Sequence, residues 1–191
     1  MLYTSIICRY ITPFDTINLC STCKEMYEKI DEHMLETSST DDFLIIKEND
    51  YYENKNEKYV LGIGQITMSL DVFDFFGTTI KFKNIDFNVS SKVSLENTVL
   101  EFEDCVFISE GRNAFIDVNS SSEIAFSFCY IKNFSLFCKI YDSETNFENT
   151  IFENVLVPIL GRRSYSNIFD TKFINCNMPI SYFENFRLVV R

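Results

Sequence analysis

The sequence has little glycine and proline and no tryptophan. Among its 191 residues there are 5 glycines, 3 prolines and 1 histidine. These numbers argue against an ordinary all-β sandwich, whose many turns depend on glycine and proline. With one histidine and no Ser–His–Asp pattern, nucleophilic catalysis has no support. Whatever bends this chain must rely on other residues.

Basic residues and long apolar runs are also scarce. Lys and Arg number 17 against 28 Asp and Glu, a net charge of -11, which argues against a nucleic-acid phosphate surface. No stretch approaches the roughly 18 apolar residues of a membrane span. Residues 2–10 are apolar but few, and Arg9 interrupts them, so we expect no signal peptide. The 7 cysteines are then expected to be reduced thiols in the cytoplasm or nucleus.

Phenylalanine and tyrosine are abundant, at 20 and 10 residues, and many belong to a repeat. A six-residue pattern recurs at residues 82–87, 102–107, 126–131, 147–152 and 168–173. By subtraction, its starts lie 20, 24, 21 and 21 residues apart. The first and last positions are large and apolar, the third is Asn or Asp in four of the five copies, and the fourth is Ile, Cys or Thr.

Each position of the pattern has a physical interpretation. The first positions are predicted to form one inward column of Phe82, Phe102, Phe126, Phe147 and Ile168. The third position suits a bend with positive φ, which Asn and Asp tolerate. The fourth and sixth positions face inward and the fifth outward, as on a strand. About eleven residues after each start a second inward stretch is expected: Val93 and Leu95, Phe115, Leu136 and Cys138, Val157 and Ile159, and Ile180.

A period near 21 residues with two or three short strands is typical of one coil of a parallel β-helix. Leucine-rich and pentapeptide repeats lack support, because neither tightly spaced leucines nor a period of five is present. The fold class is therefore mainly β. Residues 41–191 resemble the right-handed parallel β-helix family, with roughly six to seven coils. Residues 43–46 and 60–63 are expected in less regular coils.

Residues 1–40 are predicted to form a small α-helical segment. Apolar residues follow the i, i+3, i+4, i+7 spacing of a helix that packs one face: Leu19, Thr22, Cys23, Met26, Tyr27 and Ile30. A stack of coils has open ends, so this segment is expected at least to cap the first coil.

The same segment resembles the body of an F-box. The matches fall without a gap on Ile7, Ile11, Pro13, Asp15, Ile17, Leu19, Cys23, Lys24 and Tyr27. The resemblance implies an adaptor-binding set of Ile7, Ile11, Pro13, Ile17, Leu19, Cys23 and Tyr27. It also implies that the chain brings a target to a cullin–RING ubiquitin ligase through a Skp-type adaptor. The Asn-, Ile-, Lys-, Phe- and Tyr-rich usage indicates an AT-rich genome, as in large DNA viruses or some protists.

Residues that carry chemistry in other proteins favour structural roles here. Cys20 and Cys23 form a lone CxxC, and His33 lies at no usual zinc spacing, so neither a metal nor a cofactor is expected. Cys105 and Cys129 are expected as small core residues. The candidate catalytic carboxylates share repeat positions two or three coils apart, too far for an acid–base pair. They are Glu103 with Glu148 and Asp104 with Asp170.

Arg162 and Arg163 follow Gly161 and are expected in a solvated loop.

Taken together, the repeat and the F-box resemblance predict a non-enzymatic protein-interaction module that recruits a target to a ubiquitin ligase. The alternative is a structural or assembly component, such as a virion protein, whose β-helix is a binding surface and whose helices are a cap. An enzyme that acts on glycans is a more distant alternative. Protein partners are expected, and neither nucleic acid nor membrane.

Overall fold

The structure, a computed structural model, describes residues 43–47, 59–63, 66–70, 75–111, 113–177, 180–183 and 187–190. The chain divides into two units, Met1–Phe43 and Leu44–Arg191, and every described residue except Phe43 belongs to the second. Every residue of the F-box-like segment, from Ile7 to Tyr27, lies outside the described residues.

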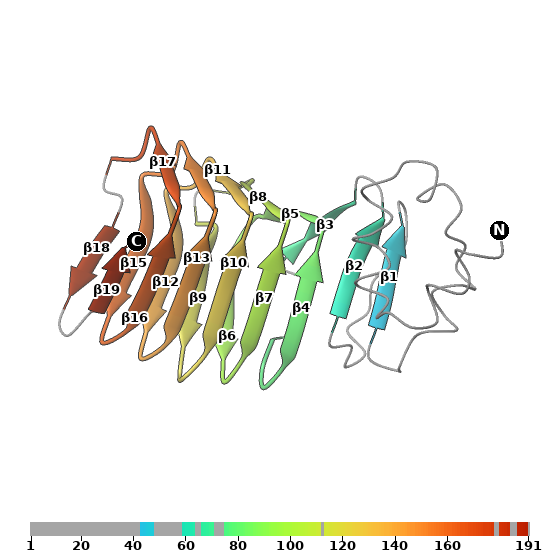
Figure 1. The fold of residues 1–191 in the computed structure, drawn as a ribbon, viewed down its shortest axis with the longest axis horizontal. Helices are drawn as coiled ribbons and strands as arrows, with labels where there is room; N and C mark the ends of the chain where they lie inside the picture. Colours follow the sequence, from blue (N-terminus) through green and yellow to red (C-terminus); the bar gives the residue numbers. More distant parts are fainter. Residues whose placement is uncertain are drawn as a thin grey trace. The chain divides into compact units, whose positions relative to one another are not determined.

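The described chain winds through three parallel sheets, here named A, B and C (Figure 1). Sheet A contains, in spatial order, β1 (Phe43–Lys47), β2 (Tyr59–Ile63), β4 (Thr79–Lys83), β7 (Val99–Glu103), β10 (Glu123–Ser127), β13 (Glu144–Glu148), β16 (Tyr165–Phe169) and β19 (Arg187–Val190). Sheet B contains β3 (Thr67–Ser69), β5 (Asp86–Val89), β8 (Val106–Ser109), β11 (Tyr130–Lys132), β14 (Ile151–Glu153) and β17 (Lys172–Ile174). Sheet C contains β6 (Lys92–Glu96), β9 (Phe115–Asn119), β12 (Leu136–Tyr141), β15 (Val157–Arg162) and β18 (Ile180–Phe183).

From β4 onward, consecutive strands visit sheets A, B and C in turn, and each strand pairs in parallel with the strand one turn away. This confirms a mainly β fold built as a parallel β-solenoid. About five turns contribute a strand to all three sheets within the described residues, the first from β4 to β6 and the last from β16 to β18. The sequence predicted roughly six to seven coils. Strands β1, β2, β3 and β19 belong to turns that are not complete in the described part of the chain.

The predicted inward column is confirmed. Phe82, Phe102, Phe126, Phe147 and Ile168 lie in register on sheet A and are 0–2% exposed. The ring centroids of Phe102 and Phe126 are 5.3 Å apart, and those of Phe126 and Phe147 are 5.0 Å apart, with nearly parallel planes. A second aromatic column from sheet B meets the first edge-on. The ring centroids of Phe107 and Phe102, for example, are 5.0 Å apart. The core is thus a ladder of stacked rings. Each ring contact contributes stability beyond that of the apolar area it buries.

The bend between sheets A and B has positive φ at the third motif position of all five copies. The φ angles are 56° at Asn84, 53° at Asp104, 56° at Phe128, 48° at Asn149 and 46° at Asp170. The next residue then turns inward and is buried in the first four copies, as at Cys105 and Cys129. The Cys129 thiol donates to the Phe102 carbonyl at 3.4 Å, and the Thr150 hydroxyl donates to the Phe126 carbonyl at 3.2 Å. Where the fourth position is Cys or Thr, its small side chain therefore also donates to a carbonyl one turn earlier.

The other two corners repeat as well, although the sequence analysis did not predict them. Between sheets B and C, positive φ falls on Asn133, Asn154 and Asn175. Between sheets C and A, it falls on Asn97, Ser121, Asp142 and Arg163. A buried hydroxyl follows each of the latter, and Ser143 Oγ accepts the Ser122 N–H at 3.2 Å. Each complete turn therefore bends three times with almost no glycine.

The second inward stretch was predicted only in part. Val93, Leu95, Cys138 and Ile159 are buried, whereas Phe115, Leu136 and Val157 are partly exposed. The paired inward column instead runs through Val93, Ile116, Cys138 and Ile159. A shift of one residue moves a side chain to the other face of a strand, so Phe115 is wrong by one position.

Candidate functional site

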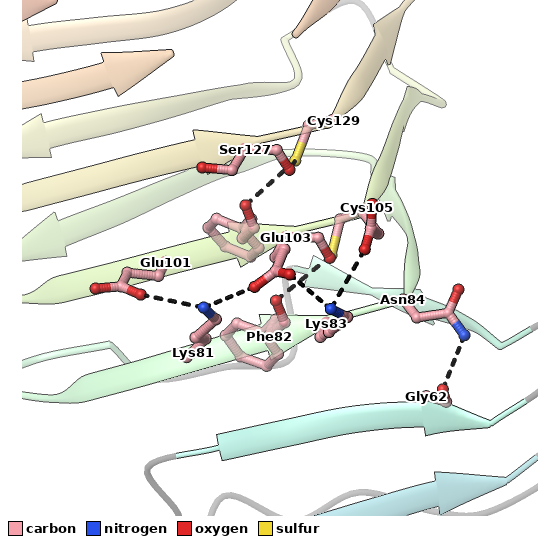
Figure 2. A network of polar contacts seen from close by, with 12 residues as sticks. Gly62, Lys81, Phe82, Lys83, Asn84, Glu101, Glu103, Cys105, Ser127 and Cys129 are labelled. Carbon is pink, nitrogen blue, oxygen red and sulfur yellow. Dashed lines mark hydrogen bonds and ion pairs between the residues drawn. The ribbon is translucent and has the colours of Figure 1, made fainter. Parts of the chain in front are cut away.

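The outer surface of sheet A, here face A, carries a cluster of ion pairs between β4 and β7. Figure 2 shows Lys81 and Lys83 of β4 reaching Glu103 of β7, with Nζ–Oε distances of 2.7 Å and 2.6 Å. Glu101 lies 3.6 Å from Lys81, and Asp104 lies 3.5 Å from Lys83. Of the carboxylates considered for catalysis, Glu103 and Asp104 are therefore ion-paired, and Glu148 and Asp170 lie exposed on a strand and in a bend.

The pKa shifts in this cluster follow from the pairing. Burial alone would raise the pKa of Glu103, but the hydrogen bonds and charges of Lys81 and Lys83 outweigh it and lower that pKa. Burial alone would lower the pKa of Lys81, and Glu103 and Glu101 outweigh it and raise it. Both shifts favour the charged forms, as expected for a structural ion-pair cluster rather than for a proton-transfer site.

Burial disfavours the thiolate form of three cysteines, Cys105, Cys129 and Cys138. Burial raises the pKa of Cys105 to about 12 and raises the pKa of Cys129 well above its ordinary value. The pKa of Cys138 is also raised, by burial and by the charge of Asp117. Because the thiolate is the nucleophile and the metal ligand, these cysteines are packing residues. Among the described residues no group of three or more His, Cys, Asp or Glu is placed to hold a metal.

The outer surface of sheet C, here face C, carries a groove across β9, β12 and β15. Its volume is about 740 Å³. It is lined by Asn119, Lys139, Ile140, Tyr141, Leu160, Gly161 and Arg162. Tyr141 pairs in register with Arg162, and Lys139 with Leu160, so the outward side chains of neighbouring turns form its walls. The groove is therefore partly apolar, with one lysine and one arginine in its lining.

Asp117 is an unusual member of face C. It is 7% exposed although it is the outward residue of β9, in register with Lys139 of β12 and Ser94 of β6. Lys92 Nζ lies 3.3 Å from its Oδ2, and Lys139 Nζ lies 3.9 Å from its Oδ1. The Oδ1 atom accepts no hydrogen bond from any described residue. Buried polar atoms are nearly always hydrogen-bonded, so this oxygen needs a donor.

Two arginines lie over the ring of Tyr141, a residue that lines the groove. The guanidinium carbons of Arg162 and Arg163 lie 5.7 Å and 4.6 Å from the centre of its ring. Arg163 occupies a bend with φ of 48° and also pairs with Asp142, with Nη2 and Oδ2 2.8 Å apart. Planar guanidinium groups held over an aromatic ring are well suited to bind carboxylates.

The sequence predicted a solvated loop at Arg162 and Arg163. The structure instead puts Arg162 at the end of β15 and Arg163 in the bend after it, both exposed and both beside Tyr141. The sequence did not indicate Asp117, Lys139 or Tyr141 as candidate site residues. The signal that could have found Tyr141 is the repeat period of about 21 residues, since Tyr141 and Arg162 are 21 residues apart by subtraction. The predicted adaptor-binding residues, and Cys20, Cys23 and His33, lie outside the described residues.

Comparisons with known proteins give no match to this chain among protein-family models, curated proteins or solved structures. In the part of the chain that the structure describes, no helix has the length and apolar character to cross a membrane.

Proposed function

We propose that this chain is a non-enzymatic protein-interaction module, the substrate-recruiting subunit of a cullin–RING ubiquitin ligase. The F-box-like segment, residues 1–40, binds a Skp-type adaptor through Ile7, Pro13, Leu19 and their neighbours. Residues 41–191 form a right-handed β-helix of six to seven coils that binds the target. The complex acts inside the cell, in the cytoplasm or nucleus.

The single observation that carries the proposal is the groove on face C, formed by parallel strands of successive turns. It offers apolar, aromatic and cationic groups side by side, the combination that proteins use to bind other proteins. Binding is favoured over catalysis because the buried thiols are held protonated and because Glu103 and Asp104 are held in ion pairs. The resemblance of residues 7–27 to an F-box supplies the adaptor.

Affinity purification of the tagged full chain from its native host cell tests the proposal. Recovery of a Skp-type adaptor together with a cullin is the expected result. Recovery of capsid proteins without an adaptor would support the alternative function, a structural or assembly component of a virion. In that function the same face is an assembly surface and the N-terminal segment is a cap.

A Pro13→Ala, Leu19→Asp double variant supplies the matched control. We expect it to fold with wild-type stability, because these residues would contribute little to the solenoid, and to lose the adaptor. Recovery of the adaptor by this variant would contradict the assigned binding residues. Unfolding of the variant, with no adaptor recovered by the wild-type chain, would leave the segment as a cap.

A further inference from the structure

The charge on face C differs from that of the whole chain. The net charge is -11, and on face A the two lysines of the cluster are neutralised by three carboxylates. Four basic side chains and two carboxylates lie on and beside face C: Lys92 and Lys139 contact Asp117, Arg163 pairs with Asp142, and Arg162 and Arg163 lie over the Tyr141 ring. Lys139 and Arg162 line the groove itself, and its lining contains no carboxylate. A cationic groove on an acidic protein attracts an anionic ligand to one place.

The apolar part of the lining restricts the class of anion. Tyr141 and Leu160 stand beside the two charged residues, on the same outward face. A small inorganic anion would leave these groups in contact with water only. A peptide whose acidic side chains alternate with apolar ones would use both kinds of group. Two interstrand spacings of about 4.8 Å separate β9 from β15, so three to four extended residues would cross the groove.

Asp117 provides an independent observation. Its Oδ1 atom is buried beside Lys139 and lacks a hydrogen-bond donor within the described residues. A carboxylate in the ligand could not donate to it, whereas a backbone N–H of a peptide could. A peptide with acidic side chains would therefore bring anionic groups to the two cations that line the groove, Lys139 and Arg162, and a donor to Asp117 Oδ1.

We propose that the groove on face C binds an acidic peptide segment of the recruited protein in extended form. Carboxylates of the peptide pair with Lys139 and Arg162, and an apolar side chain packs against Tyr141 and Leu160. This inference rests on the proposed function, since it names the part of the target that the solenoid recognises.

Fluorescence anisotropy of the full chain with labelled peptides tests the inference. The probe is a short peptide of alternating Glu and Leu, and its control carries Gln in place of Glu. We expect the wild-type chain to bind the Glu peptide at least about tenfold more tightly than the Gln peptide. Added salt should weaken binding, because the interacting charges are near the surface.

Two double variants of equal charge locate the site. Lys139→Glu with Arg162→Glu should weaken binding of the Glu peptide at least about tenfold. Lys132→Glu with Lys172→Glu changes net charge equally on sheet B and should leave the affinity within about twofold. Melting temperatures confirm folding, and Lys139→Gln with Arg162→Gln gives a milder test if the reversal unfolds the chain.

Three outcomes would overturn the inference: no preference for the Glu peptide, equal losses in the two charge reversals, or tighter groove-dependent binding of heparin than of the peptide. The last outcome would assign the groove to a sulphated glycan. These results are separable from failure of the proposed function. A chain that binds the peptide but recovers no adaptor would support the peptide site and contradict the ligase function. A chain that recovers the adaptor but does not bind the peptide would support the ligase function and contradict the peptide site.

Discussion

The A–B corner, here the inward column of sheet A together with the bend that follows it, differs from face C in how its side chains are paired. At the corner, rings stack on rings, thiols and hydroxyls reach carbonyls one turn away, and Lys81 and Lys83 neutralise Glu103. On face C, basic side chains gather over a groove and Asp117 keeps an oxygen without a donor. The polar groups of the corner are paired within the chain, whereas Asp117 Oδ1 on face C accepts no hydrogen bond from a described residue. We therefore expect the first region to supply stability, and the binding site that we propose lies in the second.

The largest expected effect is at the corner. Phe126 stacks on Phe102 and Phe147 and meets Phe107 and Phe137 edge-on. Replacing Phe126 by Ala opens a cavity among these rings and should lower the free energy of unfolding by about 3 to 5 kcal/mol. Chemical denaturation of the full chain measures this. A variant with wild-type stability would mean that the aromatic ladder does not hold the solenoid together.

A moderate effect is expected at the ion pairs of face A. Glu103→Gln removes the negative charge that both Lys81 and Lys83 contact, and should cost about 2 kcal/mol at neutral pH. Because the pKa of Glu103 is lowered by folding, its contribution is present above the unfolded value near 4.5 and is lost as pH falls through the folded pKa.

Unfolding measured between neutral and acidic pH checks the sign of that effect. Wild type and Glu103→Gln should converge in stability as the solution becomes acidic, since both side chains are then neutral. A gap that stays constant down to pH about 3 would show that the charge of Glu103 is not the cause.

The smallest effect is expected at Phe128, two residues after Phe126. Phe128 is 57% exposed and occupies a bend with φ of 56°, where the equivalent residue of two other turns is Asn. Phe128→Asn should change stability by less than about 1 kcal/mol, in the stabilising direction, because Asn tolerates this conformation better. A loss comparable to that of Phe126→Ala would contradict the division between column and bend.

The corner could be predicted from the sequence and face C could not. Large apolar residues recur there at fixed offsets, so Phe82 to Ile168 could be aligned without a structure. Residues 109–114 make one turn longer, with starts 24 residues apart, and this displaced the predicted inward residue from Ile116 to Phe115.

The candidate site depends on register across turns. Asp117 and Lys139 are 22 residues apart and Tyr141 and Arg162 are 21 apart, by subtraction, and each looks like an ordinary surface residue by itself. Only the parallel pairing of β9, β12 and β15 brings them together. An unsatisfied oxygen such as Asp117 Oδ1 has no signature in sequence, because it is a property of the surroundings.

Amide hydrogen exchange of the full chain, with and without the Glu–Leu peptide, tests the central claim most directly. The claim is that binding belongs to face C and stability to the A–B corner. We expect added protection in β9, β12 and β15 and unchanged exchange in β4, β7, β10 and β13, which are already protected by pairing. Protection confined to sheet A or sheet B, or absent from β12 and β15 with the peptide bound, would contradict the account.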